Sequence, residues 1–125
     1  PSAPNLPALK DKMKDFTRDP LALRALESDP LTLGEAQPAR TVAALLEATD
    51  RMRREFPSIT LPLLIMHGTV DRATMPSGSQ LFYEKAGSRD KTLKLYEGHF
   101  HDLLNDLDKD KVLADVIAWI EARLV

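Results

Sequence analysis

Two stretches decide the fold of this chain: Leu-Pro-Leu-Leu-Ile-Met-His-Gly-Thr-Val-Asp-Arg at residues 61–72 and Lys-Thr-Leu-Lys-Leu-Tyr-Glu-Gly-His-Phe-His at residues 91–101. The apolar run at 62–67 is too short for a helix and is typical of a strand buried on both faces. Residues 91–96 alternate in polarity like a second strand. Because a helix is expected between them at 76–87, the pattern predicts a right-handed βαβ unit with parallel strands.

Amphipathic helices are expected on both sides of this unit. Downstream, residues 109–124 have helical periodicity, and the stripe that we expect to be buried consists of Leu113, Val116, Ile117, Ile120 and Leu124. Upstream, residues 41–56 have the same periodicity and end before Pro57. A shorter helix is expected between Asp19-Pro20, an N-cap with proline at the first helical position, and Asp29-Pro30, which stops it.

Composition excludes several classes of protein. The chain has 125 residues, a formal net charge of −2 and no cysteine. The charge balance gives no electrostatic reason to expect a nucleic-acid partner. Without cysteine there is neither a disulfide framework nor a thiol nucleophile. The apolar runs are far shorter than the roughly 20 residues of a membrane-spanning helix, so no transmembrane segment is expected.

Two side chains with catalytic chemistry follow the predicted strands. Asp71 lies just after the first strand, and His101 lies on the loop after the second. Adjacent parallel strands are about 4.8 Å apart, so loops at their carboxyl ends can bring a carboxylate to an imidazole. The carboxylate would orient the ring and leave its other nitrogen free to act as a base. Spacing alone leaves another interpretation open, in which Asp71 caps the following turn and His101 is an ordinary loop histidine.

Metal binding is the weaker alternative. His99 and His101 have the spacing of a ligand pair, but no third histidine is suitably placed. Asp106, Asp108 and Asp110 begin like a calcium loop, yet Lys111 stands where glycine is needed and Ile117 stands where glutamate is needed. We therefore expect no metal, and we interpret these aspartates as favouring the N-terminus of the last helix.

The motifs together resemble one enzyme group. Residues 61–72, with Gly-Ser-Arg-Asp-Lys-Thr-Leu-Lys-Leu-Tyr-Glu-Gly-His-Phe-His-Asp-Leu-Leu-Asn-Asp at 87–106, are similar to the C-terminal half of the monoacylglycerol lipase and lysophospholipase group of α/β-hydrolases. Thr-Arg-Asp-Pro at 17–20, Ser-Asp-Pro-Leu at 28–31 and the helix at 41–56 resemble the group's cap region. The resemblance thus implies a helical cap, or lid, at 1–56 and the C-terminal part of the hydrolase core at 57–125.

The resemblance also assigns roles to residues. It makes Asp71 the acid and His101 the base of a catalytic triad, whereas His99 falls at a variable position of the motif. The group's nucleophile is a serine in a Gly-x-Ser-x-Gly elbow, and the sequence contains no such motif and no oxyanion-hole motif upstream of one. The serine is therefore expected outside this chain, in a missing N-terminal half, and the 125 residues alone are expected to be inactive.

The implied activity is serine-dependent hydrolysis of a lipid monoester, a monoacylglycerol or lysophospholipid, without a cofactor. Leu6, Leu9, Met13 and Phe16 form an apolar stripe that either walls the acyl chain or packs against the core. The alternatives are an esterase or acyltransferase acting on a small non-lipid ester, and a hydrolase-fold binding module without catalysis. A cytoplasmic or membrane-peripheral location is expected. The missing half or a second copy is expected to cover the edge of the 62–67 strand.

Overall fold

The computed structural model describes residues 13–31 and 38–124. Its elements, in chain order, are η2 (Met13–Asp15), α1 (Pro20–Ser28), α2 (Ala39–Glu55), η3 (Phe56–Ser58), β1 (Leu63–Gly68), α3 (Pro76–Lys85), β2 (Lys91–Tyr96) and α4 (Lys109–Glu121). The four α-helices and two strands expected from the sequence are all present, with ends shifted by at most three residues. At α1, Asp19 is the N-cap, and its carboxylate accepts the Leu21 backbone N–H.

The two strands form a parallel pair, as predicted. Leu63 lies opposite Lys91, and the register continues without a bulge to Gly68 opposite Tyr96. The helix α3 connects the two strands, so residues 63–96 form the expected βαβ unit. In the described part of the chain the sheet consists of these two strands only. Their carboxyl ends therefore lie side by side, and so do the loops that follow them.

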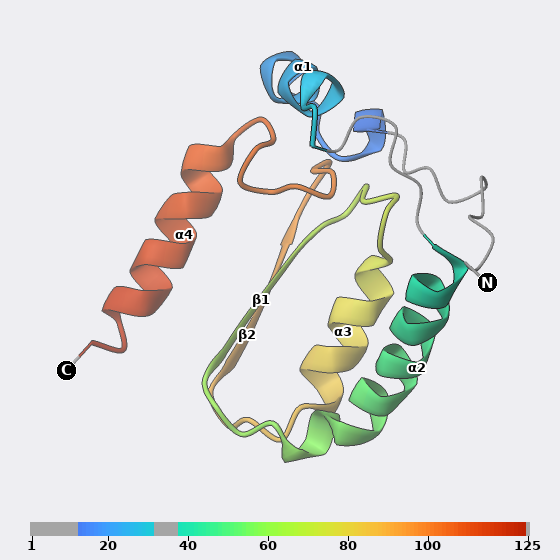
Figure 1. The fold of residues 1–125 in the computed structure, drawn as a ribbon. Helices are drawn as coiled ribbons and strands as arrows, with labels where there is room; N and C mark the ends of the chain where they lie inside the picture. The colour runs from blue at the N-terminus through green and yellow to red at the C-terminus, as the bar shows by residue number, and fades with distance from the viewer. Residues whose placement is uncertain (1–12, 32–37, 125) are drawn as a thin grey trace.

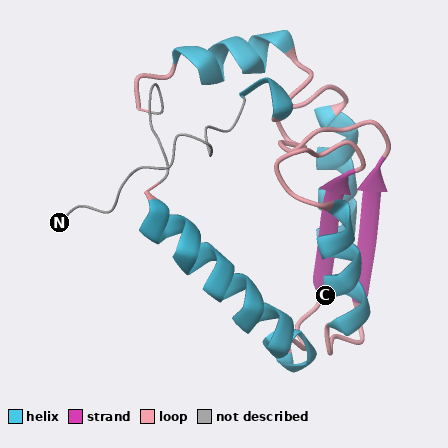
Figure 2. Cartoon of the chain, turned by 90° about the vertical axis from the view of Figure 1, so that its right-hand side faces the viewer, coloured by secondary structure: helices cyan, strands magenta, loops and turns pink. Residues whose placement is uncertain are grey.

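The helices lie on both faces of the sheet and across its carboxyl end. Figure 1 shows α2 and α3 on one side of the strands, α4 on the other, and η2 with α1 beyond the strand ends. Phe56, at the end of α2, packs against Phe82 of α3 with ring centroids 4.7 Å apart. In Figure 2, α2 runs diagonally away from the sheet toward its own N-terminus, so this end of α2 is where it joins the sheet layer.

The strand β1 is less buried than the sequence pattern predicts. Only Ile65 and Gly68 of its six residues are buried, and the remaining four are partly exposed. A strand needs neighbours on both edges and layers on both faces to be fully buried, and β1 has β2 on one edge alone. The apolar run therefore indicates that β1 has further neighbouring strands or covering layers beyond those that the described residues supply.

The buried stripe expected on α4 is wrong. Four of its five residues, Leu113, Ile117, Ile120 and Leu124, are between 46% and 73% exposed, whereas Val116 is partly buried. The fully buried residue of the helix is Val112. Helical periodicity identifies an apolar face but not the element that covers it. In the described residues Asp115 and Trp119 of α4 contact β2, and most of the predicted stripe is exposed instead.

Polar contacts attach α4 to β2. Asp115 accepts the hydroxyl of Tyr96 at 2.8 Å and pairs with Lys94 at 2.6 Å. Burial, reinforced by this hydrogen bond, raises the pKa of Tyr96, which therefore stays protonated. Further along, the Trp119 indole N–H donates to Thr92 at 3.2 Å, and the Arg123 guanidinium lies 3.8 Å over the Trp119 ring.

None of the helices within residues 13–31 and 38–124 combines the length and the apolar character that crossing a bilayer requires.

Candidate active site

The loops after β1 and β2 touch through their backbones. A Cβ atom on Gly68 would lie 2.3 Å from the His99 carbonyl oxygen and 2.4 Å from that of Phe100, so only glycine permits this approach. The Val70 N–H donates to the His99 carbonyl at 3.1 Å. Gly98 turns the second loop with φ of 73°, a left-handed conformation that favours glycine. These backbone contacts fix the spacing between the two loops independently of the side chains of the site.

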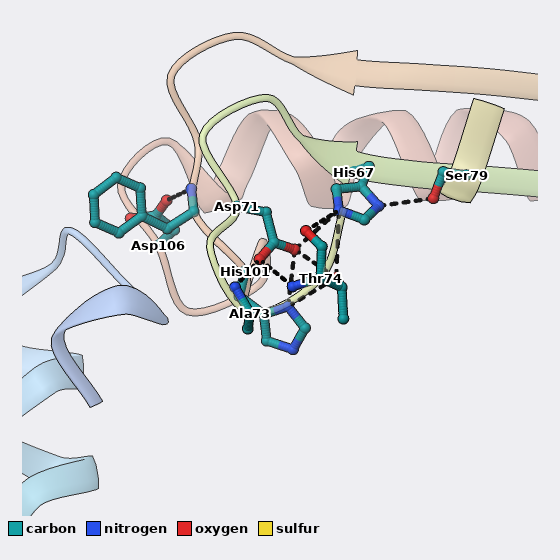
Figure 3. A network of polar contacts seen from close by, with 8 residues as sticks. His67, Asp71, Ala73, Thr74, Ser79, His101 and Asp106 are labelled. Atoms are coloured by element: carbon teal, nitrogen blue, oxygen red, sulfur yellow. Dashed lines mark hydrogen bonds and ion pairs between the residues drawn. The ribbon is translucent and has the colours of Figure 1, made fainter. Parts of the chain in front are cut away.

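Asp71 makes both sets of contacts that the sequence left as alternatives. Its Oδ1 caps the following turn by accepting the backbone N–H groups of Ala73 at 2.8 Å and Thr74 at 2.9 Å. Its Oδ2 accepts the His101 Nδ1–H at 2.9 Å and the Thr74 hydroxyl at 2.8 Å. The expected approach of Asp71 and His101 is therefore confirmed as geometry, and the capping of the turn fixes the carboxylate that meets the ring (Figure 3).

The surroundings keep Asp71 ionised. Its side chain is 2% exposed. Burial alone would raise the pKa, but the Thr74 backbone N–H, the His101 ring, the Thr74 hydroxyl and the Ala73 N–H outweigh it and hold the pKa below its ordinary value. A carboxylate that is charged at neutral pH and aimed at Nδ1 fixes which imidazole nitrogen carries the proton.

His101 presents its second nitrogen away from this pair. The Nδ1–H is used by Asp71, which leaves Nε2 as the nitrogen that can accept a proton, and the side chain as a whole is 35% exposed. Phe16 meets the imidazole edge-on, with ring centroids 5.1 Å apart. An apolar ring thus flanks the exposed imidazole. Of the stripe expected to wall an acyl chain, Phe16 reaches the site, Met13 lies in η2, and Leu6 and Leu9 lie outside the described residues.

A buried carboxylate, Asp106, anchors the loop that carries His101. It is 1% exposed and accepts the Phe100 N–H at 2.9 Å, beside His101. It also accepts the Arg18 N–H at 2.7 Å and the Arg18 Nε–H at 2.9 Å. Burial works to raise the pKa of Asp106, but the N–H groups of Phe100, Arg18 and Leu107 and the Arg18 side chain hold it below its ordinary value.

This role corrects one sequence interpretation. Asp106 was expected to favour the N-terminus of the last helix, but it holds Arg18, which lies 88 residues away. Of the other two aspartates, Asp110 lies in the first turn of α4, and Asp108 is the N-cap residue with φ of 62°, without a side-chain cap. His99 is apart from the Asp71 pair: it is buried, and its Nδ1 lies 3.1 Å from the Glu97 carbonyl.

Sequence reasoning missed three polar side chains of the site: His67, Thr74 and Ser79. His67 Nε2 lies 3.0 Å from Asp71 Oδ2, and His67 Nδ1 lies 2.7 Å from Ser79 Oγ (Figure 3). Thr74 could have been found from its position three residues after Asp71, where capping partners lie. Ser79 is on α3 and carries no signal that separates it from a helix-surface serine.

Comparison with known proteins identifies the family. The sequence profile of the family described as serine aminopeptidase, S33 (Hydrolase_4) matches residues 1–108. The chain belongs to this hydrolase family. A caffeoylshikimate esterase of Arabidopsis thaliana is 37% identical over 110 residues, which are 86% of this chain and 33% of that protein. A monoacylglycerol lipase of Mycolicibacterium smegmatis is 33% identical over 122 residues, 98% of this chain and 44% of that protein.

Two solved structures of monoacylglycerol lipases share the fold of this chain. A soluble variant of monoglyceride lipase from Saccharomyces cerevisiae, in complex with a substrate analog, superposes with a TM-score of 0.82 at 25% identity, over 93% of this chain and 43% of that one. The monoacylglycerol lipase of Paleococcus ferrophilus gives 0.84 at 23% identity, over 91% and 44%. The expected partial α/β-hydrolase fold and the likeness to the monoacylglycerol lipase group are confirmed. The chain spans less than half the length of these relatives.

Proposed function

We propose that this chain supplies the acid and the base of a serine-dependent carboxylic ester hydrolase that acts on lipid monoesters. The observation that carries the proposal is the buried, ionised Asp71 holding Nδ1 of a partly exposed His101. A binding module without catalysis has no need of such a pair, which speaks against that alternative. Residues 1–56 would be the helical cap and residues 57–125 the C-terminal part of the catalytic core.

In this mechanism the nucleophilic serine comes from a part of the protein outside these 125 residues. His101 Nε2 removes the hydroxyl proton while the serine oxygen forms a bond to the ester carbonyl carbon. Collapse of the tetrahedral intermediate expels the alcohol, which takes the proton from His101. Water then attacks the acyl-enzyme with the same base and releases the fatty acid. Asp71 stays ionised and stabilises the imidazolium in both halves of the reaction.

Two features support a lipid substrate. Phe16 places an apolar ring against His101, and Leu21, Leu45, Leu46 and Met52 of the cap helices expose between 53% and 67% of their surface. The names of the relatives from Mycolicibacterium smegmatis and Saccharomyces cerevisiae point to the same class. The caffeoylshikimate esterase favours a second candidate, a small non-lipid ester, since its identity to this chain, 37%, exceeds the 33% of the Mycolicibacterium smegmatis lipase.

The test compares neighbouring histidines in the longer protein that contains this chain. With a monoacylglycerol as substrate, we expect His101→Ala to lower kcat by about three orders of magnitude or more, because only the base acts in the transition state. His99→Ala should stay within about tenfold of the parent. Equal losses in the two variants would contradict the assignment. A higher kcat/KM on caffeoylshikimate than on the monoacylglycerol would select the second candidate.

The 125 residues by themselves should have no esterase activity, because the nucleophile is absent. Turnover of a p-nitrophenyl ester that disappears in His101→Ala would show that the nucleophile lies within the chain.

The remaining part of the longer protein is also the partner that we propose for the open edge of β1. The chain spans 33% to 44% of the length of its relatives, and the edge of β1 away from β2 carries unpaired backbone groups in the described structure. A second copy of the chain is the alternative partner.

A further inference from the structure

Two imidazoles share one oxygen of Asp71, and the proposed triad uses only one of them. His101 Nδ1 lies 2.9 Å from Asp71 Oδ2, and His67 Nε2 lies 3.0 Å from the same atom. The two rings approach from different elements, since His67 is in β1 and His101 follows β2 (Figure 3). His67 is also the more enclosed ring, with 11% of its side chain exposed against 35% for His101.

The contacts of His67 fix the position of its proton. Its Nε2 faces two acceptors, the Asp71 carboxylate at 3.0 Å and the Thr74 carbonyl oxygen at 3.3 Å. An imidazole nitrogen in contact with two acceptors must carry hydrogen, whether the ring is neutral or charged. Its Nδ1 faces the Ser79 hydroxyl at 2.7 Å, and a hydroxyl can either donate or accept. The result is a chain of hydrogen bonds from Ser79 through His67 to Asp71.

These hydrogen bonds attach Asp71 to an element outside its own turn. The Ala73 and Thr74 contacts all come from the loop that carries Asp71, so they move with it. Ser79 lies in α3, which packs against both strands. A donor from β1 also stabilises the buried charge, at the same oxygen that accepts the His101 ring and the Thr74 hydroxyl.

We propose that His67 and Ser79 are positioning residues that set the orientation and proton arrangement of Asp71 for catalysis. This inference rests on the proposed function. His67 acts through its Nε2–H donor, and Ser79 acts by holding the ring. Neither touches the substrate.

The test uses three variants of the longer protein and one matched control. His67→Leu removes the donor, His67→Gln restores an N–H at about the position of Nε2, and Ser79→Ala removes the anchor. Ser77→Ala is the control, because it is exposed on the same helix. We expect His67→Leu to lower kcat about 10- to 100-fold, with KM changed less than about threefold. His67→Gln should recover most of kcat, Ser79→Ala should lose about threefold to tenfold, and Ser77→Ala should match the parent.

A spectroscopic measurement gives a second readout that does not depend on activity. In the parent protein labelled with ¹⁵N-histidine, the His67 signals, identified by their loss in His67→Gln, should show Nε2 protonated at neutral pH. If the longer protein lacks esterase activity, the proposed function fails and this measurement alone decides the role of His67.

Three outcomes would overturn the inference. One is a His67 ring protonated only at Nδ1. Another is a His67→Gln variant as impaired as His67→Leu, which would show that the ring matters for packing and not as a donor. The third is a Ser79→Ala variant as inactive as His101→Ala, which would make Ser79 the nucleophile. Should His67→Leu fail to fold, Ser79→Ala and the tautomer measurement still decide the question.

Discussion

At the scale of single residues, the site depends on carboxylates that are buried and yet charged. The side chains of Asp71 and Asp106 are 2% and 0% exposed, and both carboxyl groups have a pKa below the ordinary value of 3.8. Each is surrounded by N–H donors, which replace the water lost on burial. Asp71 holds the proposed base, and Asp106 holds the loop that presents it.

The first prediction concerns Asp106→Asn. An amide has one acceptor oxygen, so its NH₂ group would face two donors. They are either the Phe100 N–H and the Arg18 Nε–H or the backbone N–H groups of Arg18 and Leu107. We expect a loss of about 1–3 kcal/mol in the free energy of unfolding at pH 7, measured by urea denaturation. Asp110→Asn, at an exposed position in the first turn of α4, is the control and should cost about 0.5 kcal/mol or less.

The same pair of proteins gives a pH dependence with a definite sign. Because the folded pKa of Asp106 is lowered, its contribution is complete above the ordinary value of 3.8 and is lost as pH falls through the folded pKa. The difference between parent and Asp106→Asn should therefore be constant from pH 5 to 7 and should shrink below about pH 3.8. A difference that grows on acidification would contradict the role given to the charge.

At the scale of elements, the loop after β1 and the loop after β2 are held together by backbone contact at Gly68. The contact places the His99 and Phe100 carbonyls where a Cβ of residue 68 would be. The distance between Asp71 and His101 is therefore set by a strand end and a turn, and not by the two side chains themselves.

The second prediction tests this contact. Gly68→Ala forces the loop at 99–101 to move, so we expect a loss of about 1–3 kcal/mol in stability and a fall in kcat of the longer protein. Gly78→Ala is the matched control: its added methyl meets nothing within 4 Å, and alanine favours the helix α3 by up to about 1 kcal/mol. Equal activity and stability in the two variants would show that the loops adjust freely.

The helices and strands were predictable from the sequence, whereas the tertiary contacts between them were only partly predictable. The strand at 91–96 and the helix N-cap at Asp19 have local signals, and both agree with the structure. The pairing of Asp71 with His101 followed from strand order and from the resemblance. The link between Arg18 and Asp106 had no signal, because residues 88 positions apart are joined by tertiary folding alone. The stripe on α4 was wrongly predicted to be buried, because helical periodicity identifies an apolar face but does not show which element packs against it.

At the scale of the whole molecule, the described residues leave much apolar surface uncovered. The outward face of α4, defined by Leu113, Ile117 and Ile120, and Leu124 just after the helix are between 46% and 73% exposed. The free edge of β1 adds unpaired backbone groups. Large exposed apolar surfaces in folded proteins mark interfaces. The proposed partner for these surfaces is the remaining part of the longer protein.

The third prediction tests whether the outward face of α4 is covered in the longer protein or is simply exposed to solvent. Ile117→Lys should leave the stability of the 125-residue chain unchanged and should reduce its self-association in size-exclusion chromatography with light scattering. In the longer protein the same change should cost about 2 kcal/mol or more, because it would bury a charge. Ala118→Lys, exposed on the same helix, introduces the same charge and should be tolerated in both proteins. Equal tolerance of both variants in the longer protein would contradict the covering of this face.

The stacking of Arg123 on Trp119 has an optical consequence. Trp119 is the only tryptophan of the chain. Its indole N–H donates to Thr92 of β2, and its ring lies under the guanidinium of Arg123, just after α4. Its fluorescence therefore reports on the contact between α4 and β2. A change in its emission wavelength or intensity records the separation of α4 from β2, and the emission stays unchanged while only α1 and α2 rearrange.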